Sequence, residues 1–225
     1  MTTLLDSVVL EPGRTADAAV LWLHGLGASG LDFPPIVPEL GLAEDHGIRF
    51  VFPHAPKIPV TVNGGMVMPA WYDILAMDFD RKVDESGVRR SGAALDALIE
   101  RERARGIPPS RIVLAGFSQG GAIALHAGLR YPEPLAGIMA LSTYIAADCD
   151  LDAERTEANG DVPILWCHGT RDPMVGIEMG EAGRKRLEGL GYAVDWNTFP
   201  MEHQVVPEEI DIIGAWLRRV LPAVA

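Results

Sequence analysis

One pentapeptide, Gly116-Phe-Ser-Gln-Gly120, constrains this chain more than any other stretch. It matches the pattern G-x-S-x-G and lies between an apolar run, Ile112–Ala115, and a run of small, helix-compatible residues from Gly121. A strand, this pattern and a helix together are typical of a nucleophile elbow, a sharp turn that exposes a serine hydroxyl. The glycines fit such a turn because strand and helix approach closely and the serine adopts unfavourable backbone angles. A plain glycine-rich loop is the alternative interpretation.

Short apolar runs alternate with longer helical patterns along the whole chain. The predicted strands are Ser7–Leu10, Ala18–Leu23, Ile48–Phe52, Ile112–Ala115, Leu135–Leu141, Pro163–Cys167 and Ala193–Phe199. The predicted helices are a short one within Leu31–Leu40, then Asp84–Arg105, the segment from Gly121, Gly176–Leu190 and Pro207–Leu221. This alternation favours an α/β fold whose mostly parallel sheet carries helices on both faces. We expect Ser142–Asp161 to be a loop with a short helix.

Residues 53–76 interrupt this alternation with an irregular stretch. Alternating β-formers surround Asn63-Gly64, which is a hairpin signal. Aromatic residues and methionines accompany the hairpin, among them Trp71. The stretch would either roof a site or cover the edge of the core, and the pattern leaves both open.

Length, charge and cysteine usage limit the classes of function. A chain of 225 residues favours a single domain over 1–225 without a large cap. The net charge of −12 disfavours nucleic-acid binding, because an acidic protein repels phosphates. We find no signal-peptide pattern and no apolar run near the ~20 residues of a membrane helix. Cys149 and Cys167 form no metal or disulfide spacing, which favours a cytoplasmic location. Cys167 lies inside an apolar run, so we expect it to be a buried core thiol.

A serine hydroxyl becomes a strong nucleophile only when a base takes its proton. In folds with this elbow the order along the chain is serine, acid, histidine, so His203, after the last predicted strand, is the candidate base for Ser118. Asp172 follows the preceding predicted strand and is the preferred acid, since the carboxyl edge of an α/β sheet holds its sites. Asp148 and Asp150, after an earlier strand, are competitors for that role.

The negative oxygen that forms on attack needs two N–H donors. The residue after the nucleophile, Gln119, supplies one, and the glycine-rich loop after an early strand supplies the other, for which we choose Leu26. His24 in that loop and His168 are expected to play structural parts.

Taken together, five motifs resemble the bacterial carboxylesterases related to acyl-protein thioesterases and lysophospholipases. The motifs are His24-Gly-Leu-Gly27, Pro69-Ala-Trp-Tyr-Asp73, Gly116-Phe-Ser-Gln-Gly-Gly121, His168-Gly-Thr-Arg-Asp-Pro173 and Met201-Glu-His203. The resemblance implies an α/β-hydrolase fold and hydrolysis of small carboxylic esters, and sometimes thioesters, without a metal or other cofactor. It implies a triad of Ser118, Asp172 and His203, and Leu26 and Gln119 as oxyanion donors. It also implies an acyl groove near Trp71, Leu75 and Met174, although ordinary core packing is the alternative for these side chains, more so for Leu75 than for Trp71.

The sequence departs from the family pattern at two places near the expected site. Ala28-Ser29 stands where an acidic residue often follows, and Met174-Val175-Gly176 replaces the more usual ending. These departures bear on the preferred acyl length and leave the reaction type unchanged. A lipase or peptidase on the same scaffold and a catalytically inert binding protein are the rival functions. The sequence leaves a homodimer open and predicts no integral membrane contact.

Overall fold

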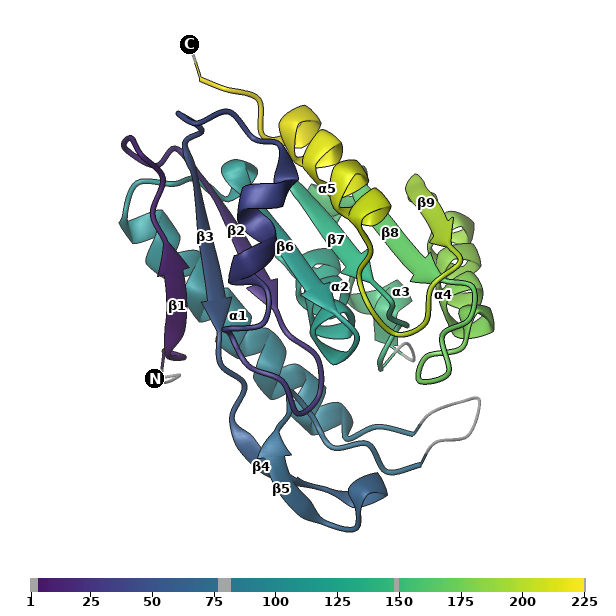
Figure 1. Ribbon diagram of the computed structural model, residues 1–225. Helices are drawn as coiled ribbons and strands as arrows, with labels where there is room; N and C mark the ends of the chain where they lie inside the picture. Colours follow the sequence, from purple (N-terminus) through teal and green to yellow (C-terminus); the bar gives the residue numbers. More distant parts are fainter. Residues whose placement is uncertain (1–3, 77–81, 148–149, 225) are drawn as a thin grey trace.

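The computed structural model describes residues 4–76, 82–147 and 150–224, and a seven-stranded sheet organises them (Figure 1). Its strands are β1 (Ser7–Leu10), β2 (Ala18–Leu23), β3 (Ile48–Pro53), β6 (Ile112–Phe117), β7 (Gly137–Leu141), β8 (Ile164–Gly169) and β9 (Val194–Phe199). They lie in the order β1-β3-β2-β6-β7-β8-β9, and β1 alone of the seven runs antiparallel to its neighbour. The predicted α/β-hydrolase architecture is confirmed.

Helices cover both faces of this sheet (Figure 1). One face carries α5 (Pro207–Val220) and the 3₁₀ helix η1 (Pro34–Leu40), and the other carries α1 (Glu85–Ala104), α2 (Gln119–Arg130) and α4 (Ile177–Gly189). The shorter elements are η3 (Pro109–Arg111), α3 (Leu151–Glu154) and η5 (Glu157–Asn159). Side chains alternate between two apolar cores because successive strand residues point to opposite faces. Within β2, for example, Leu21 belongs to one core and Trp22 to the other.

Most element boundaries lie within one or two residues of their predicted positions. Helix α1 buries one face against the sheet, and Glu102 on that face forms an ion pair with Arg49 at 2.7 Å. The short helix expected within Leu31–Leu40 is a 3₁₀ helix, consistent with the prolines that interrupt it. No helix in the described part of the chain has the length and apolarity needed to cross a membrane.

The irregular stretch contains the predicted hairpin, formed by β4 (Lys57–Val60) and β5 (Met66–Pro69). A 3₁₀ turn, η2 (Thr61–Asn63), and two glycines with positive φ join the strands, so the connection is longer than a two-residue turn. The hairpin lies beyond the sheet, on the side toward which the arrowheads of β2, β6 and β7 point (Figure 1). It therefore lies at the carboxyl edge, where the sequence motifs place the site.

Candidate active site

Ser118 lies at the tip of the turn from β6 to α2, with φ 56° and ψ −121°. These angles are strained for a residue other than glycine, and such strain is concentrated at functional sites. A Cβ atom on Gly116 would collide with the backbone of Gly120, and one on Gly120 would lie 2.6 Å from the His24 carbonyl oxygen. The glycines of the motif are thus required by the close approach of strand, helix and neighbouring loop.

Hydrogen bonds from β7 and the residues after it hold the strained turn in place. The Ser118 N–H donates to the Leu141 carbonyl at 2.8 Å, and Thr143 Oγ1 donates to the Ser118 carbonyl at 2.6 Å. Because these bonds fix the backbone on both sides of its Cα atom, the Ser118 side chain is aimed by the fold.

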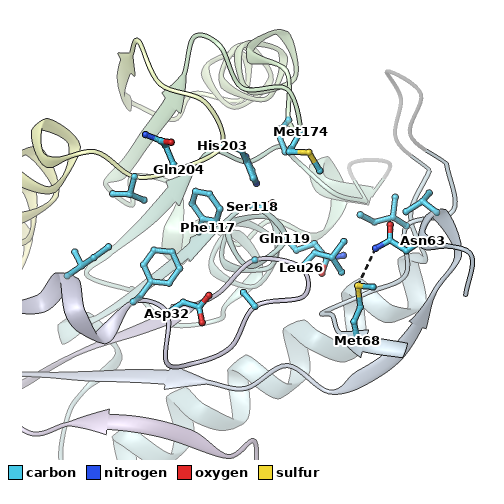
Figure 2. A pocket seen from close by; sticks show the side chains of 18 residues that line it. Leu26, Asp32, Asn63, Met68, Phe117, Ser118, Gln119, Met174, His203 and Gln204 are labelled. Carbon is cyan, nitrogen blue, oxygen red and sulfur yellow. Dashed lines mark hydrogen bonds between the residues drawn. The ribbon is translucent and has the colours of Figure 1, made fainter. Parts of the chain in front are cut away.

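His203 and Asp172 are joined by a short hydrogen bond. His203 Nδ1 donates to Asp172 Oδ2 at 2.6 Å, which leaves Nε2 as the ring nitrogen free to take a proton. The two residues follow neighbouring strands, whose register pairs Gly169 with Phe199. The His203 ring lies 4.7 Å from the ring of Phe117, beside Ser118, and both line the same pocket (Figure 2). The structure therefore brings all three predicted triad residues to one place.

The Asp172 carboxylate is buried and held by several donors. Burial alone would raise its pKa, but hydrogen bonds from His203 and from the N–H groups of Val175 and Met174 outweigh burial and lower the pKa below its usual value. The competing acid Asp150 lies apart from this cluster, in an exposed ion pair with Arg89 at 2.7 Å. Asp148, the other competitor, lies outside the described residues.

The two predicted oxyanion donors are the backbone N–H groups of Gln119 and Leu26, and both residues line the same pocket as Ser118. Gln119 is the first residue of α2, and Leu26 lies in the loop after β2. Neither N–H donates a hydrogen bond within the described part of the chain. The Gln119 side chain is occupied, since its Oε1 accepts the Trp71 N–H at 3.0 Å and its Nε2 donates to the Tyr72 carbonyl at 2.8 Å. The side chain thereby ties α2 to the segment after the hairpin.

The two histidines that were expected to be structural, His24 and His168, form hydrogen bonds from their rings to backbone groups. His24 Nδ1 donates to the Gly25 carbonyl at 2.7 Å, and its Nε2 accepts the Ala55 N–H at 3.1 Å. His168 Nε2 donates to the Val175 carbonyl at 2.9 Å. Burial lowers the pKa of both rings, which keeps them neutral, and each fixes a loop at the site.

A pocket of about 580 Å³ opens around Ser118 (Figure 2). Of the three side chains expected in an acyl groove, Met174 lines this pocket. Trp71 does not: it is buried behind the loop after β2, where its indole N–H donates to the His24 carbonyl at 2.8 Å. Leu75 is 48% exposed and lies outside the lining, whereas its neighbour Ile74 lies within it. The irregular stretch therefore reaches the pocket, but through residues other than Trp71 and Leu75.

Several residues of the pocket wall were missed by sequence reasoning. They are Asp32, Phe33, Ile36, Val62, Asn63, Met68, Ile74, Phe117, Gln204 and Val205. The hairpin signal could have pointed to Met68 and Asn63, because the hairpin was already a candidate roof. Asp32 and Phe33 gave no such signal, since they belong to a loop and to the cap of a short 3₁₀ helix.

Comparisons with known proteins agree with this geometry. A model of the family described as phospholipase/carboxylesterase matches residues 5–221. Acyl-protein thioesterase 1 of Gibberella zeae is 42% identical over 215 residues, covering 91% of this chain and 91% of that protein. The crystal structure of Arabidopsis thaliana SOBER1 has a TM-score of 0.86 at 34% identity and covers 91% of this chain and 99% of that one. For acyl-protein thioesterase 2 of Zea mays the TM-score is 0.85 at 27% identity, with coverage of 96% and 99%.

The curated relatives are fungal, so they lend no support to the narrower expectation of a bacterial branch. The family itself is shown by the match over nearly the whole chain and by the identity to the thioesterases. This chain belongs to the phospholipase/carboxylesterase family of α/β hydrolases.

Proposed function

We propose that this protein is a serine hydrolase that cleaves small carboxylic esters and thioesters through an acyl-enzyme on Ser118. The names of its relatives, acyl-protein thioesterases and an esterase, and the description of its family support this class of reaction. The observation that carries the proposal is the hydrogen bond from His203 to the buried Asp172, in a pocket that also holds a strained serine.

In the proposed mechanism Ser118 Oγ attacks the carbonyl carbon while His203 Nε2 takes the hydroxyl proton. The N–H groups of Leu26 and Gln119 stabilise the oxyanion, and one such donor typically lowers the barrier by ~3 kcal/mol. His203 then protonates the leaving alcohol or thiol. Water, activated by the same ring, releases the acid and restores the serine. Asp172 holds the His203 tautomer and stabilises the imidazolium without taking up the proton.

Replacement of the serine tests the proposal. We expect Ser118→Ala to lower kcat for a short p-nitrophenyl ester by at least ~10³-fold, with an unchanged far-UV circular dichroism spectrum. Appreciable residual turnover by the folded variant would contradict the assignment.

A fluorophosphonate probe separates the rival functions. A catalytic serine is labelled and an inert one is not, so absence of label on the folded wild-type chain would favour a binding protein that has lost catalysis. Turnover of triglycerides or peptides in preference to small esters would favour the lipase or peptidase alternative.

Several narrower expectations belong to the same proposal. We propose one catalytic domain over residues 1–225, and a cytoplasmic location supported by the buried free thiol of Cys167. A homodimer, a bacterial affiliation within the family and the absence of cofactors stay predictions. Light scattering checks the first of these three.

A further inference from the structure

The pocket around Ser118 has two halves of different chemistry. Figure 2 shows Asp32, Phe117 and Gln204 on one side of the pocket, and Met68, Asn63 and Met174 on the other. We call the first the alcohol half, lined by Ala28, Asp32, Phe33, Ile36, Gln204 and Val205. We call the second the acyl half, lined by Leu26, Val62, Asn63, Met68, Ile74 and Met174. The division continues below the surface, since Phe33, Ile36 and Val205 pack in one core and Leu26, Val62 and Ile74 in the other.

The proposed reaction decides which half receives the leaving group. His203 has to protonate the departing oxygen or sulfur, so that atom must lie at the ring. Gln204 and Val205 directly follow His203 and line the alcohol half. The leaving group therefore extends along these residues toward Asp32, and the acyl chain occupies the acyl half, under the hairpin.

Asp32 gives the alcohol half a fixed negative group. It carries the one formally charged side chain among the described residues that line the pocket, the titratable His203 apart. Its Oδ1 accepts the Ser29 N–H at 3.2 Å and the Ser29 hydroxyl at 2.9 Å. Nothing in the described ranges donates a hydrogen bond to its Oδ2. The carboxylate is thus held in position with one oxygen available to a ligand.

Aromatic rings connect this carboxylate with the catalytic residues. The rings of Phe33 and Phe117 lie 5.8 Å apart, and Phe117 lies 4.7 Å from His203. Phe33 is fixed from behind by stacking on Trp22 at 5.2 Å. An aromatic face attracts a cation, and a carboxylate beside the ring adds a Coulombic attraction of its own. Carboxylate and rings together form a site suited to an organic ammonium group.

We infer that the alcohol half selects a cationic leaving group, an alcohol or thiol that carries an ammonium a short chain away from the reacting atom. This inference rests on the proposed hydrolase function. In the reaction the Ser118 Oγ–acyl bond forms, the bond from the acyl carbon to the leaving oxygen or sulfur breaks, and that atom takes the proton from His203. The ammonium takes no part in bond changes; Asp32 and Phe33 bind it.

The test compares two esters that differ only in charge, butyrylcholine and 3,3-dimethylbutyl butyrate. The second has a carbon atom in place of the ammonium nitrogen and the same shape. We expect kcat/KM to favour butyrylcholine by about fivefold at low salt, and the preference to shrink in 0.5 M NaCl. Asp32→Asn, which retains an acceptor for Ser29, should reduce the preference to about twofold or less.

Glu39→Gln is the matched control, because Glu39 is exposed on η1 and lies outside the pocket lining. It should keep the preference of the wild type. Equal kcat/KM for both esters in the wild type, or an unchanged preference in Asp32→Asn, would overturn the inference while leaving the hydrolase function intact. Failure to turn over either ester, with no fluorophosphonate label, would instead remove the proposed function itself.

Discussion

The elbow (residues 116–121) and the hairpin (β4–β5) border the same pocket and are built in opposite ways. In the elbow, backbone touches backbone, and an added Cβ on Gly121 would meet the Gly116 carbonyl and the side chain of Thr143 at 2.8 Å. In the hairpin, Gly64 and Gly65 have open space around them, and Met66 and Val67 are each 63% exposed. The reacting atoms thus rest on the closely packed region, while the hairpin that borders the pocket is largely exposed.

This difference teaches which substitutions should affect chemistry and which should affect selectivity. A closely packed backbone transmits a small displacement directly to Ser118 Oγ, and about 1 Å of misplacement costs ~10²-fold in rate. An exposed hairpin can change its side chains with little strain, because they have few neighbours. The following predictions test this contrast, from the largest expected effect to the smallest.

The same substitution in the two regions should have very different outcomes. Gly120→Ala should abolish activity and destabilise the fold by several kcal/mol, on the order of 3 or more, because the new Cβ meets the carbonyls of Leu23 and His24. Gly64→Ala should cost only about 1 kcal/mol, from its φ of 66°, since no atom lies within 4 Å. Urea unfolding and p-nitrophenyl butyrate turnover measure both, and similar losses in the two variants would break the comparison.

Within the catalytic region, the effect of removing a carboxylate on kcat should depend on whether that carboxylate contacts His203. Asp172→Asn should lower kcat by about 10²–10⁴-fold with a nearly unchanged KM, because the histidine tautomer is no longer held. Asp150→Asn breaks an exposed ion pair with Arg89 and should change kcat by no more than about twofold. The reverse result would move the role of the acid to the competitor.

The buried carboxyl group of Glu209 should make the stability of the fold depend on pH. Glu209 is fully buried in α5, which follows the His203 loop, and neither carboxylate oxygen has a side-chain partner among the described residues. Burial raises the pKa of Glu209 to about 8, so between its unfolded value and about 8 the folded state keeps a proton that the unfolded state releases. Stability should therefore fall as pH rises through this range.

Replacement of Glu209 by glutamine removes this dependence. Glu209→Gln should be more stable than the wild type at pH 8, by on the order of 2–4 kcal/mol, and similar to it at pH 4.5. Thermal unfolding at both values checks the sign. Equal shifts at both pH values would show that protonation of Glu209 is not the cause.

The smallest effect is expected in the hairpin. Met68 lines the pocket, and its Sδ accepts the Asn63 Nδ2–H at 3.3 Å. Met68→Ala should lower kcat/KM for an octanoyl ester by about fivefold and leave the acetyl ester nearly unchanged, since only the longer chain reaches it. Val67→Ala, whose 63%-exposed side chain points to the opposite face of the same strand, should leave both unchanged. A loss for both esters in Met68→Ala would mean that the hairpin supports the chemistry as well.

The same contrast explains how far sequence reasoning reached. Strand, elbow and helix follow from local patterns, and the order serine, acid, histidine leaves few candidates, so the fold and the proximity of Ser118, Asp172 and His203 could be predicted. Side chains of the exposed wall follow no such rule. In an extended segment a shift of one residue reverses the direction of a side chain, which is why Ile74 and not Leu75 reaches the pocket.

Trp71 shows a second limit of sequence reasoning. An aromatic residue next to a predicted site was interpreted as a substrate contact, but its indole nitrogen binds the backbone of the loop after β2. Such a role depends on a partner 47 residues away in the sequence, which no local pattern reveals. Asp32 was missed for another reason, because a loop has no periodic pattern that shows which side chain faces a pocket.

The pairing of Gly169 with Phe199 between β8 and β9 has a consequence for how correct folding of the enzyme can be detected. Asp172 and His203 directly follow the ends of these two strands, and β9 has no neighbouring strand on its outer side in the described sheet. A slip of one position there would shift the imidazole by roughly 3.3 Å and turn its strand over, without removing the other six strands. Catalytic activity would thus report whether β8 and β9 pair in the correct register. Far-UV circular dichroism reports only secondary structure content and would not detect such a slip.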